Sequence, residues 1–277
     1  MPTGKWVPGD FRRFVATNTT STRVAQVETD TGSAFVKALG NPEGPHALVS
    51  EWVGTSLADW LGLPTLDYAI MELQPQDEIE LEPGLFANRG PAFVTRFEEN
   101  LQSWNGLESQ LDRIENADDI TRLVVLDTWV LNRDRHAPKT AQRRPNPDNV
   151  ALKGIKGASE RYKLMAIDHT HCFTRSSSEI TKAVGDIDHV KCEEIYGLFP
   201  AFQKRLSMQG LRDALDRMSN ISEGIDRIID AVPDEWLLEP GARGALRKLV
   251  VGRSGFLASW LPHALSKDYP QLNLGLV

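Results

Sequence analysis

The sequence predicts an α+β protein in two parts: a strand-rich part over residues 1–100 and a mainly helical part over residues 101–277. In residues 11–40, short runs of β-branched and aromatic residues alternate with polar turns, a pattern typical of strands. From about residue 118, apolar residues recur at helical spacing. A cleft between two such parts is the place where we expect a ligand to bind.

Composition narrows the class of protein. The chain has 277 residues, of which 41% are hydrophobic and 25% charged, so it can bury a substantial core. Its net charge of -7 argues against general nucleic-acid binding, which usually requires a basic surface. Two cysteines, Cys172 and Cys192, are too few for a disulfide framework, so a cytoplasmic location is expected. Neither a signal peptide nor a membrane span is expected, because no suitable apolar run is present.

The N-terminal strands come first in the chain. Residues 11–15, 23–28 and 34–39 have the β-branched, aromatic or apolar content of strands. An almost wholly polar tip at 17–22 separates the first two strands, and the sequence TDTG at 29–32 predicts a turn before the third. This part of the chain is therefore expected to contain a β-hairpin followed by a further strand.

A helix and two more strands are expected next. Residues 46–62 have apolar side chains at helical spacing, and Gly62 is a plausible end for that helix. Residues 66–73 and 92–97 have the composition of strands, and an acidic loop at 76–82 lies between them.

The second part contains a helix, a paired-strand unit and further helices. Residues 120–131 form an apolar helical pattern, and a basic, proline-rich loop at 138–147 follows. Residues 150–152 and 162–167 are expected to pair as strands around a glycine-containing turn. From residue 180 to residue 265 the chain is expected to be mainly helical.

Lys37 and Glu51 are the first candidates for chemistry. Lys37 ends a strand-like run, where its ammonium can contact nucleotide phosphates, although a lone strand lysine is usually solvated. Glu51 lies among apolar helix positions, and a carboxylate near an apolar face requires a partner. A pair between the two would fix the lysine for phosphate contact. The alternative for Glu51 is an ordinary surface position on an amphipathic helix.

The polar tip between the first two strands includes Thr19, Thr20 and Ser21. Their hydroxyls and backbone N–H groups can cover phosphates. The tip contains no glycine and does not match the Walker pattern, so a solvated hairpin loop is the alternative.

Two aspartates and an asparagine in residues 131–173 form a second set of candidates. Asp134 follows a helix in the sequence LNRDRH and can orient the proton of an attacking hydroxyl. Asn149 precedes a strand-like segment, where it can bind a metal ion or simply form a turn. Asp168 follows the apolar run LMAI, and a carboxylate in that position is expected to cap, pair or bind a cation.

Zinc is an alternative for the sequence DHTHC, which contains His169, His171 and Cys172. In a strand the two histidines share one face while Asp168 and Cys172 lie on the other, and no second Cys/His cluster supports the site. Zinc is therefore the weaker interpretation.

The order of these motifs resembles that of HipA-like kinases. The chain has a strand lysine (FVKAL), a helix glutamate (ALVSEWVGTSLADWLGLP), then DTWVLNRDRH, NVAL and LMAIDH. The resemblance covers about residues 10–265 and extends more distantly to phosphatidylinositol kinases. It implies a bilobal protein-kinase-like fold, with an ATP cleft between an N-lobe and a helical C-lobe. It also implies ATP- and Mg²⁺-dependent transfer of the γ-phosphate to a hydroxyl of an unidentified protein or small-molecule acceptor.

The resemblance assigns roles to the candidate residues. Lys37 would contact the α- and β-phosphates and pair with Glu51. Asp134 would be the catalytic aspartate, and Asn149 and Asp168 would hold magnesium.

A hinge segment is also implied. Residues 93–97, including Phe93, Val94 and Thr95, would meet adenine through their backbone.

The chain departs from the family pattern in three places. The family's asparagine follows DRH after two residues, where this chain has Lys139, so an insert at 138–148 is taken to move it to Asn149. The phosphate loop lacks glycine, and HTHCF follows Asp168 in place of a glycine-containing motif. Two alternatives to an active kinase therefore remain: a pseudokinase that binds nucleotide without turnover, and an enzyme that transfers AMP.

Overall fold

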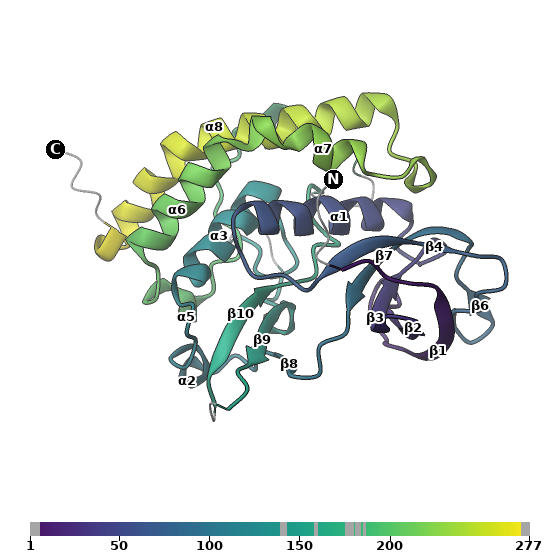
Figure 1. Cartoon of the computed structure of the whole chain (residues 1–277). Helices are drawn as coiled ribbons and strands as arrows, with labels where there is room; N and C mark the ends of the chain where they lie inside the picture. Colours follow the sequence, from purple (N-terminus) through teal and green to yellow (C-terminus); the bar gives the residue numbers. More distant parts are fainter. Residues whose placement is uncertain are drawn as a thin grey trace.

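The computed structural model describes residues 6–138, 143–157, 160–174, 180, 184 and 187–272. Its N-terminal part is a five-stranded antiparallel sheet (Figure 1). The strands, in their order across the sheet, are β1 (Phe11–Thr17), β2 (Ala25–Thr29), β3 (Gly32–Lys37), β7 (Gly90–Arg96) and β4 (Tyr68–Leu73). The N-terminal strands and the helix after β3 lie close to where the sequence predicts them.

Side-chain alternation gives this sheet two different faces. Ala34 and Val36 of β3 are fully buried in a small core formed with β2, β4 and β7. Phe35 and Lys37 point the opposite way because successive side chains of a strand lie on opposite faces. The period of two therefore directs Lys37 away from the small core and toward the rest of the molecule.

Helix α1 (Pro45–Trp60) lies between this sheet and the C-terminal helices (Figure 1). It contacts β7, α3 (Asp118–Val130) and α7 (Ile225–Asp230). Its side chains are buried from Ala47 to Ala58 without a break. Because the helix is covered on several sides, Glu51 is buried although it is charged, and it is only 2% exposed.

The C-terminal part begins with a small antiparallel sheet of β10 (Tyr162–Ala166), β9 (Val150–Gly154) and β8 (Leu101–Ser103). Later helices then share the largest core with α3. They are α5 (Pro200–Gln203), α6 (Met208–Ser219), α7 and α8 (Pro240–Asp268). Minor elements are α2 (Glu108–Leu111), β5 (Glu80–Glu82), β6 (Leu85–Phe86) and the 3-10 turns η1 (Pro147–Asn149), η2 (Ile187–His189), η3 (Ile221–Glu223), η4 (Asp234–Trp236) and η5 (Pro270–Leu272).

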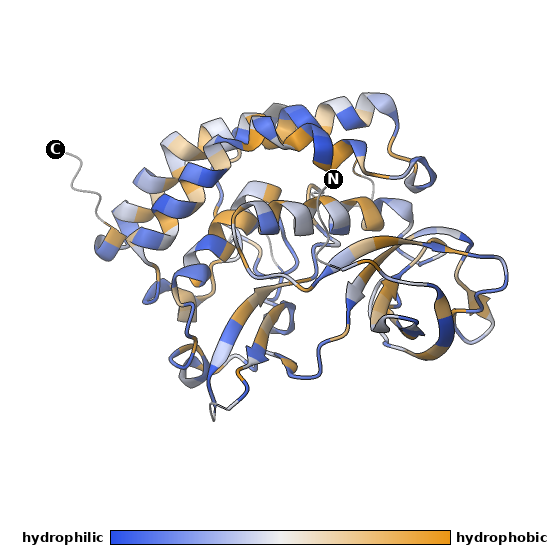
Figure 2. Ribbon diagram, viewed as in Figure 1, coloured by the Kyte–Doolittle hydropathy of each residue, from blue (hydrophilic) through white to orange (hydrophobic). Residues whose placement is uncertain are grey.

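The outer helices show the hydropathy pattern expected of a surface layer. Helix α6 buries Gly210, Leu211, Ala214 and Met218, which recur at helical spacing. Its other positions are mostly hydrophilic (Figure 2). Within the described parts of the chain, no helix is long and apolar enough to cross a membrane.

The structure confirms the α+β class, with a strand-rich N-terminal part and a helical C-terminal part. Three local predictions differ. The acidic loop at 76–82 contains strand β5, and strand β8 was not predicted. The helical prediction from residue 180 was too broad, because residues 192–199 are irregular. Of the basic loop at 138–147, residues 139–142 lie outside the described residues.

Candidate functional site

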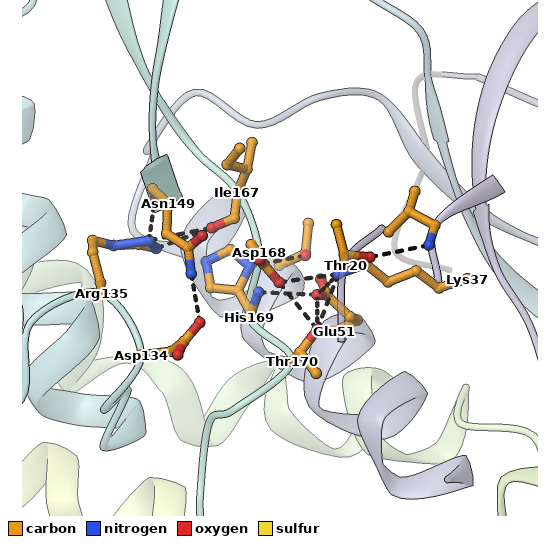
Figure 3. A network of polar contacts seen from close by, with 12 residues as sticks. Thr20, Lys37, Glu51, Asp134, Arg135, Asn149, Ile167, Asp168, His169 and Thr170 are labelled. Atoms are coloured by element: carbon orange, nitrogen blue, oxygen red, sulfur yellow. Dashed lines mark hydrogen bonds and ion pairs between the residues drawn. The ribbon is translucent and has the colours of Figure 1, made fainter. Parts of the chain in front are cut away.

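Lys37 is the centre of a buried polar cluster. Its Nζ forms an ion pair with Oε1 of Glu51 from α1 and lies 3.0 Å from Oδ1 of Asp168, just after β10 (Figure 3). It also donates to Oγ1 of Thr170 at 2.9 Å. The side chains of Lys37 and Glu51 are 12% and 3% exposed. The predicted Lys37–Glu51 pair is therefore present, and Asp168 joins it.

Glu51 also fixes the segment that follows Asp168. Its Oε1 accepts a hydrogen bond from the backbone N–H of His169 at 3.1 Å and from Oγ1 of Thr170 at 2.6 Å. The same Thr170 oxygen lies 3.0 Å from Oδ1 of Asp168. Sequence reasoning missed Thr170. Strand alternation could not have identified it, because the chain leaves the extended conformation at Asp168, which has φ 55°.

The ion pairs decide the charge states in this cluster. Burial lowers the pKa of Lys37, but the charges of Asp168 and Glu51 raise it above its ordinary value, so the amine stays protonated. Burial raises the pKa of Glu51, against the opposing effect of Lys37. Burial also raises the pKa of Asp168, but Lys37 and the surrounding hydrogen bonds outweigh it and hold that pKa below the ordinary value. Asp168 is therefore a carboxylate at neutral pH, as a cation ligand must be.

The low pKa of Asp168 predicts an acid-sensitive contribution to stability. The folded chain binds this proton less readily than the unfolded chain, so the stabilisation is present above the ordinary pKa of 3.8 and is lost as the pH falls below it. Urea unfolding of wild type and Asp168→Asn at about pH 5.5 and about pH 3 measures this effect. We expect wild type to be the more stable at the higher pH and the difference to shrink at the lower pH. A difference independent of pH would contradict the assignment.

The loop that carries Asp134 is held by the end of α3. The helix ends at Leu131, which caps it in the left-handed region with φ 56°. Asn132 donates from Nδ2 to Oδ1 of Asp127 at 3.0 Å, and its own Oδ1 accepts the backbone N–H of Asp134 at 3.1 Å. Arg135 donates from Nε to Oδ2 of Asp127 at 3.0 Å, and both partners are fully buried. Asp127 therefore anchors the loop.

Arg135 joins this loop to the two strands of the site. Its guanidinium donates to the backbone carbonyl oxygens of Asn149 at 2.7 Å and Ile167 at 3.0 Å. The carboxylate with which Arg135 pairs is that of Asp127. One buried side chain thus positions the Asp134 loop beside the start of β9 and the residue before Asp168.

Asn149 lies beside Asp134 despite the insert between them. Its Nδ2 donates to Oδ2 of Asp134 at 2.7 Å (Figure 3). The guanidinium of Arg143 forms an ion pair with the other carboxylate oxygen, Oδ1. Asn149 is 7% exposed, and the side chain of Asp134 is 14% exposed. Sequence reasoning noted the basic character of the insert and did not single out Arg143.

A cavity extends from the Lys37 cluster between the two parts of the chain. Its polar end includes Lys37, Glu51 and Asp168. Its apolar walls are formed by Val24, Phe35, Leu66, Phe93, Leu101, Ala166 and Ile167. A cavity with one charged end and apolar walls suits a ligand that has an aromatic group and an anionic group. A wider hollow, lined in part by Trp60 and Arg217, lies beside the C-terminal end of α1 and includes none of the predicted site residues.

The polar tip reaches this cavity at one of its three predicted residues. Thr20 lines the cavity, whereas Thr19 lines a separate hollow with Arg23 and Glu82. Ser21 is exposed and lines neither. The turn explains this difference: Thr20 Oγ1 accepts the backbone N–H of Val24 at 3.1 Å, which holds that side chain inside the hairpin.

The predicted adenine contact through the backbone is contradicted at residues 93–95 and stays a prediction for residues 96–97. Residues 93–95 lie in β7, which pairs with β3 on one side and β4 on the other. A strand between two antiparallel neighbours uses its N–H and C=O groups in both ladders, so these residues have no free backbone for adenine. Phe93 and Thr95 line the cavity with their side chains, and Val94 points into the small core. Backbone outside both ladders begins after Arg96.

The structure does not support the zinc alternative. Among the described residues, no three His, Cys, Asp or Glu side chains come together to hold a metal ion. His169 is instead fully buried, and its Nδ1 lies 3.1 Å from Oγ1 of Thr55. Burial lowers the pKa of His169 to about 3, so its imidazole is neutral.

Comparisons with known proteins identify a family and a similar fold. The family model described as HipA-like kinase matches residues 17–249. The structure of the proinflammatory kinase CtkA from Helicobacter pylori matches with a TM-score of 0.57 and 13% identity, covering 94% of this chain and 96% of that one. HipA of Shewanella oneidensis MR-1, in a complex with HipB and operator DNA, matches with a TM-score of 0.41 and 12% identity. This match covers 96% of this chain and 70% of that one. No curated protein matches the sequence significantly.

The family match spans most of the chain, and the CtkA match independently supports the kinase-like fold. The chain therefore belongs to the HipA-like kinase family.

Proposed function

We propose that this protein transfers the γ-phosphate of ATP to a hydroxyl group of a protein or small-molecule acceptor. The observation that carries the proposal is the buried cluster of Lys37, Glu51 and Asp168 at the charged end of an otherwise apolar cavity. A lysine held between two carboxylates is fixed in place, and an ammonium in such a position binds the phosphates of a nucleotide in kinases. The apolar walls then accommodate adenine.

Asp134 is the proposed acceptor of the hydroxyl proton. The acceptor oxygen bonds to the γ-phosphorus, the bond to the bridging oxygen of ADP breaks, and the hydroxyl proton goes to the Asp134 carboxylate. Asp127 and Arg135 act by positioning, because they hold the Asp134 loop and neither side chain lines the cavity.

The residues present fit a magnesium ion. Oxygen donors are the ligands that Mg²⁺ prefers, and Asn149 and Asp168 supply an amide oxygen and a carboxylate. Asn149 donates its amide nitrogen to Asp134, which leaves its side-chain oxygen for a cation. Asp168 is a carboxylate with a low pKa, and its side chain is 35% exposed. A bound magnesium ion would neutralise charge on the phosphates, and these two residues are proposed to hold it.

The proposed lobes are residues 1–100 and 101–277, with the cavity lined from both. The two cysteines, Cys172 and Cys192, are free and buried, which suits a reducing cytoplasm and supports the proposal that the protein works there.

A pseudokinase is the second candidate. The observation that favours it is that both carboxylate oxygens of Asp134 already have partners, Asn149 and Arg143. A pseudokinase would bind nucleotide without turning it over.

The test combines binding with turnover. ATP with Mg²⁺ at 100 times its Kd should stabilise the protein by ~2.7 kcal/mol, which thermal unfolding measures. Incubation with cell lysate and labelled ATP should add phosphoryl groups to an acceptor, identified by intact mass. Stabilisation without turnover would favour the pseudokinase, and the added mass of an AMP group would favour AMP transfer. No stabilisation by any nucleotide would contradict all three.

A further inference from the structure

Arg143 has a position that the proposed reaction does not explain. It lies in the insert that separates Asp134 from Asn149, and its guanidinium pairs with Oδ1 of Asp134. Among the described residues this carboxylate is the only partner of the Arg143 side chain. The side chain of Arg143 is 46% exposed, whereas that of Asp134 is 14% exposed. The pair thus joins a solvated cation to the largely covered group on which the chemistry depends.

The two partners of Asp134 differ in what they do to it. Asn149 donates one neutral hydrogen bond to Oδ2 and leaves Oδ1 uncovered. Arg143 pairs its guanidinium with that second oxygen, Oδ1. It also occupies the oxygen that an incoming hydroxyl would approach. Neither carboxylate oxygen of Asp134 is consequently open to an acceptor hydroxyl while the pair is closed.

We propose that Arg143 is a built-in inhibitory residue that holds Asp134 in a resting ion pair. This pair must open before Asp134 can contact the hydroxyl of the acceptor. This inference rests on the proposed function and adds a regulatory contact to the same site. The exposure of Arg143 makes opening easy, because an ion pair with a solvated partner is weak. Arg143 therefore reduces the rate several-fold and does not lock the site.

The test uses ATP turnover to water, which requires no knowledge of the acceptor. Water attacks the γ-phosphorus, ADP leaves, and the proton of the water goes to Asp134, giving ADP and phosphate. At saturating Mg–ATP we expect Arg143→Ala to raise kcat about two- to five-fold, which corresponds to the loss of one solvated ion pair. The kcat of Arg143→Lys should lie between those of Arg143→Ala and wild type, because lysine keeps the positive charge. Arg144→Ala is the matched control, since Arg144 is the exposed neighbour and makes no ion pair in the part of the chain that is described.

The dependence of kcat on salt concentration is a second measurement. A purely structural role of Arg143 would not affect it. Raising KCl from about 50 to about 300 mM screens exposed charges. We expect the kcat of wild type to rise toward that of Arg143→Ala, and the kcat of the variant to stay flat. Equal or lower kcat in Arg143→Ala, or the same salt response in both proteins, would overturn the inference.

The two proposals fail differently. If Asp134→Asn removes turnover and Arg143→Ala leaves it at the wild-type rate, only the resting ion pair is refuted. If no variant, Arg143→Ala included, turns over ATP above the Asp134→Asn background and no acceptor in cell lysate gains phosphoryl groups, the proposed kinase activity is refuted, and the inference with it.

Discussion

Replacing Asp134 with asparagine is expected to reduce phosphoryl transfer by about 10²- to 10⁴-fold, the usual contribution of a positioned general base. Asparagine has nearly the same shape and cannot accept the hydroxyl proton. The surrounding loop should persist, because it is held by Asp127, Asn132 and Arg135 through contacts that do not use the Asp134 side chain. The affinity for nucleotide should change little, since Asp134 does not line the cavity.

Asp148→Asn is the matched control for this variant. Asp148 lies in η1 directly before Asn149 and is exposed, so the same loss of charge occurs one residue from the site. Its turnover should equal that of wild type. Single-turnover kinetics with saturating Mg–ATP measures the chemical step, and thermal stabilisation by ATP checks the binding. Wild-type turnover by Asp134→Asn would show that another group takes the proton.

The parts of the site that sequence reasoning could predict are those with a local physical signal. Glu51 lies among apolar helix positions, and Asp168 follows an apolar strand, so each was expected to need a partner. Lys37 ends a strand whose alternation separates it from the small core. These three residues meet in the structure. Local pattern was sufficient because buried charges require compensation.

The hinge could not be predicted in the same way. Residues 93–95 were correctly expected to form a strand, but their function depends on where that strand lies in the sheet. Strand β7 pairs with β4 and also with β3, which lies before α1 in the chain, and it is central as a result. A strand pattern does not reveal whether one or both of its edges are paired. The adenine contact was therefore assigned to backbone that is already used.

The anchoring residues were also hidden, because their partners are distant in the fold or lie in an irregular loop. Asp127 lies at a position expected to be buried in a helix. The ion pair is seen only in the structure, where the loop after the helix brings Arg135 back to Asp127. Arg143 is one of several basic residues in the insert, and its sequence neighbours do not distinguish it. Only the folded loop brings its guanidinium to Asp134.

Removal of the Lys37 ammonium is expected to destabilise the fold strongly. Lys37→Ala leaves Glu51 buried, with a side chain that is 3% exposed and without its cation. Breaking a buried ion pair from one side typically destabilises by about 3–5 kcal/mol. The free energy of urea unfolding at neutral pH measures the loss. Lys153→Ala is the control: its partner Glu98 is 24% exposed and Lys153 itself 39%, so that exposed pair should contribute no more than about 1 kcal/mol.

A double variant separates stability from function. In Lys37→Met/Glu51→Leu both charges are replaced by apolar side chains, and such replacements of buried ion pairs are often neutral or stabilising. We expect it to recover much of the stability that Lys37→Ala loses, although Asp168 and Thr170 lose a partner. Phosphoryl transfer should stay absent, because no ammonium remains to bind the phosphates. If the double variant were as unstable as Lys37→Ala, packing at Lys37 rather than charge compensation would explain the loss. If it regained turnover, the lysine would have no role in binding phosphate.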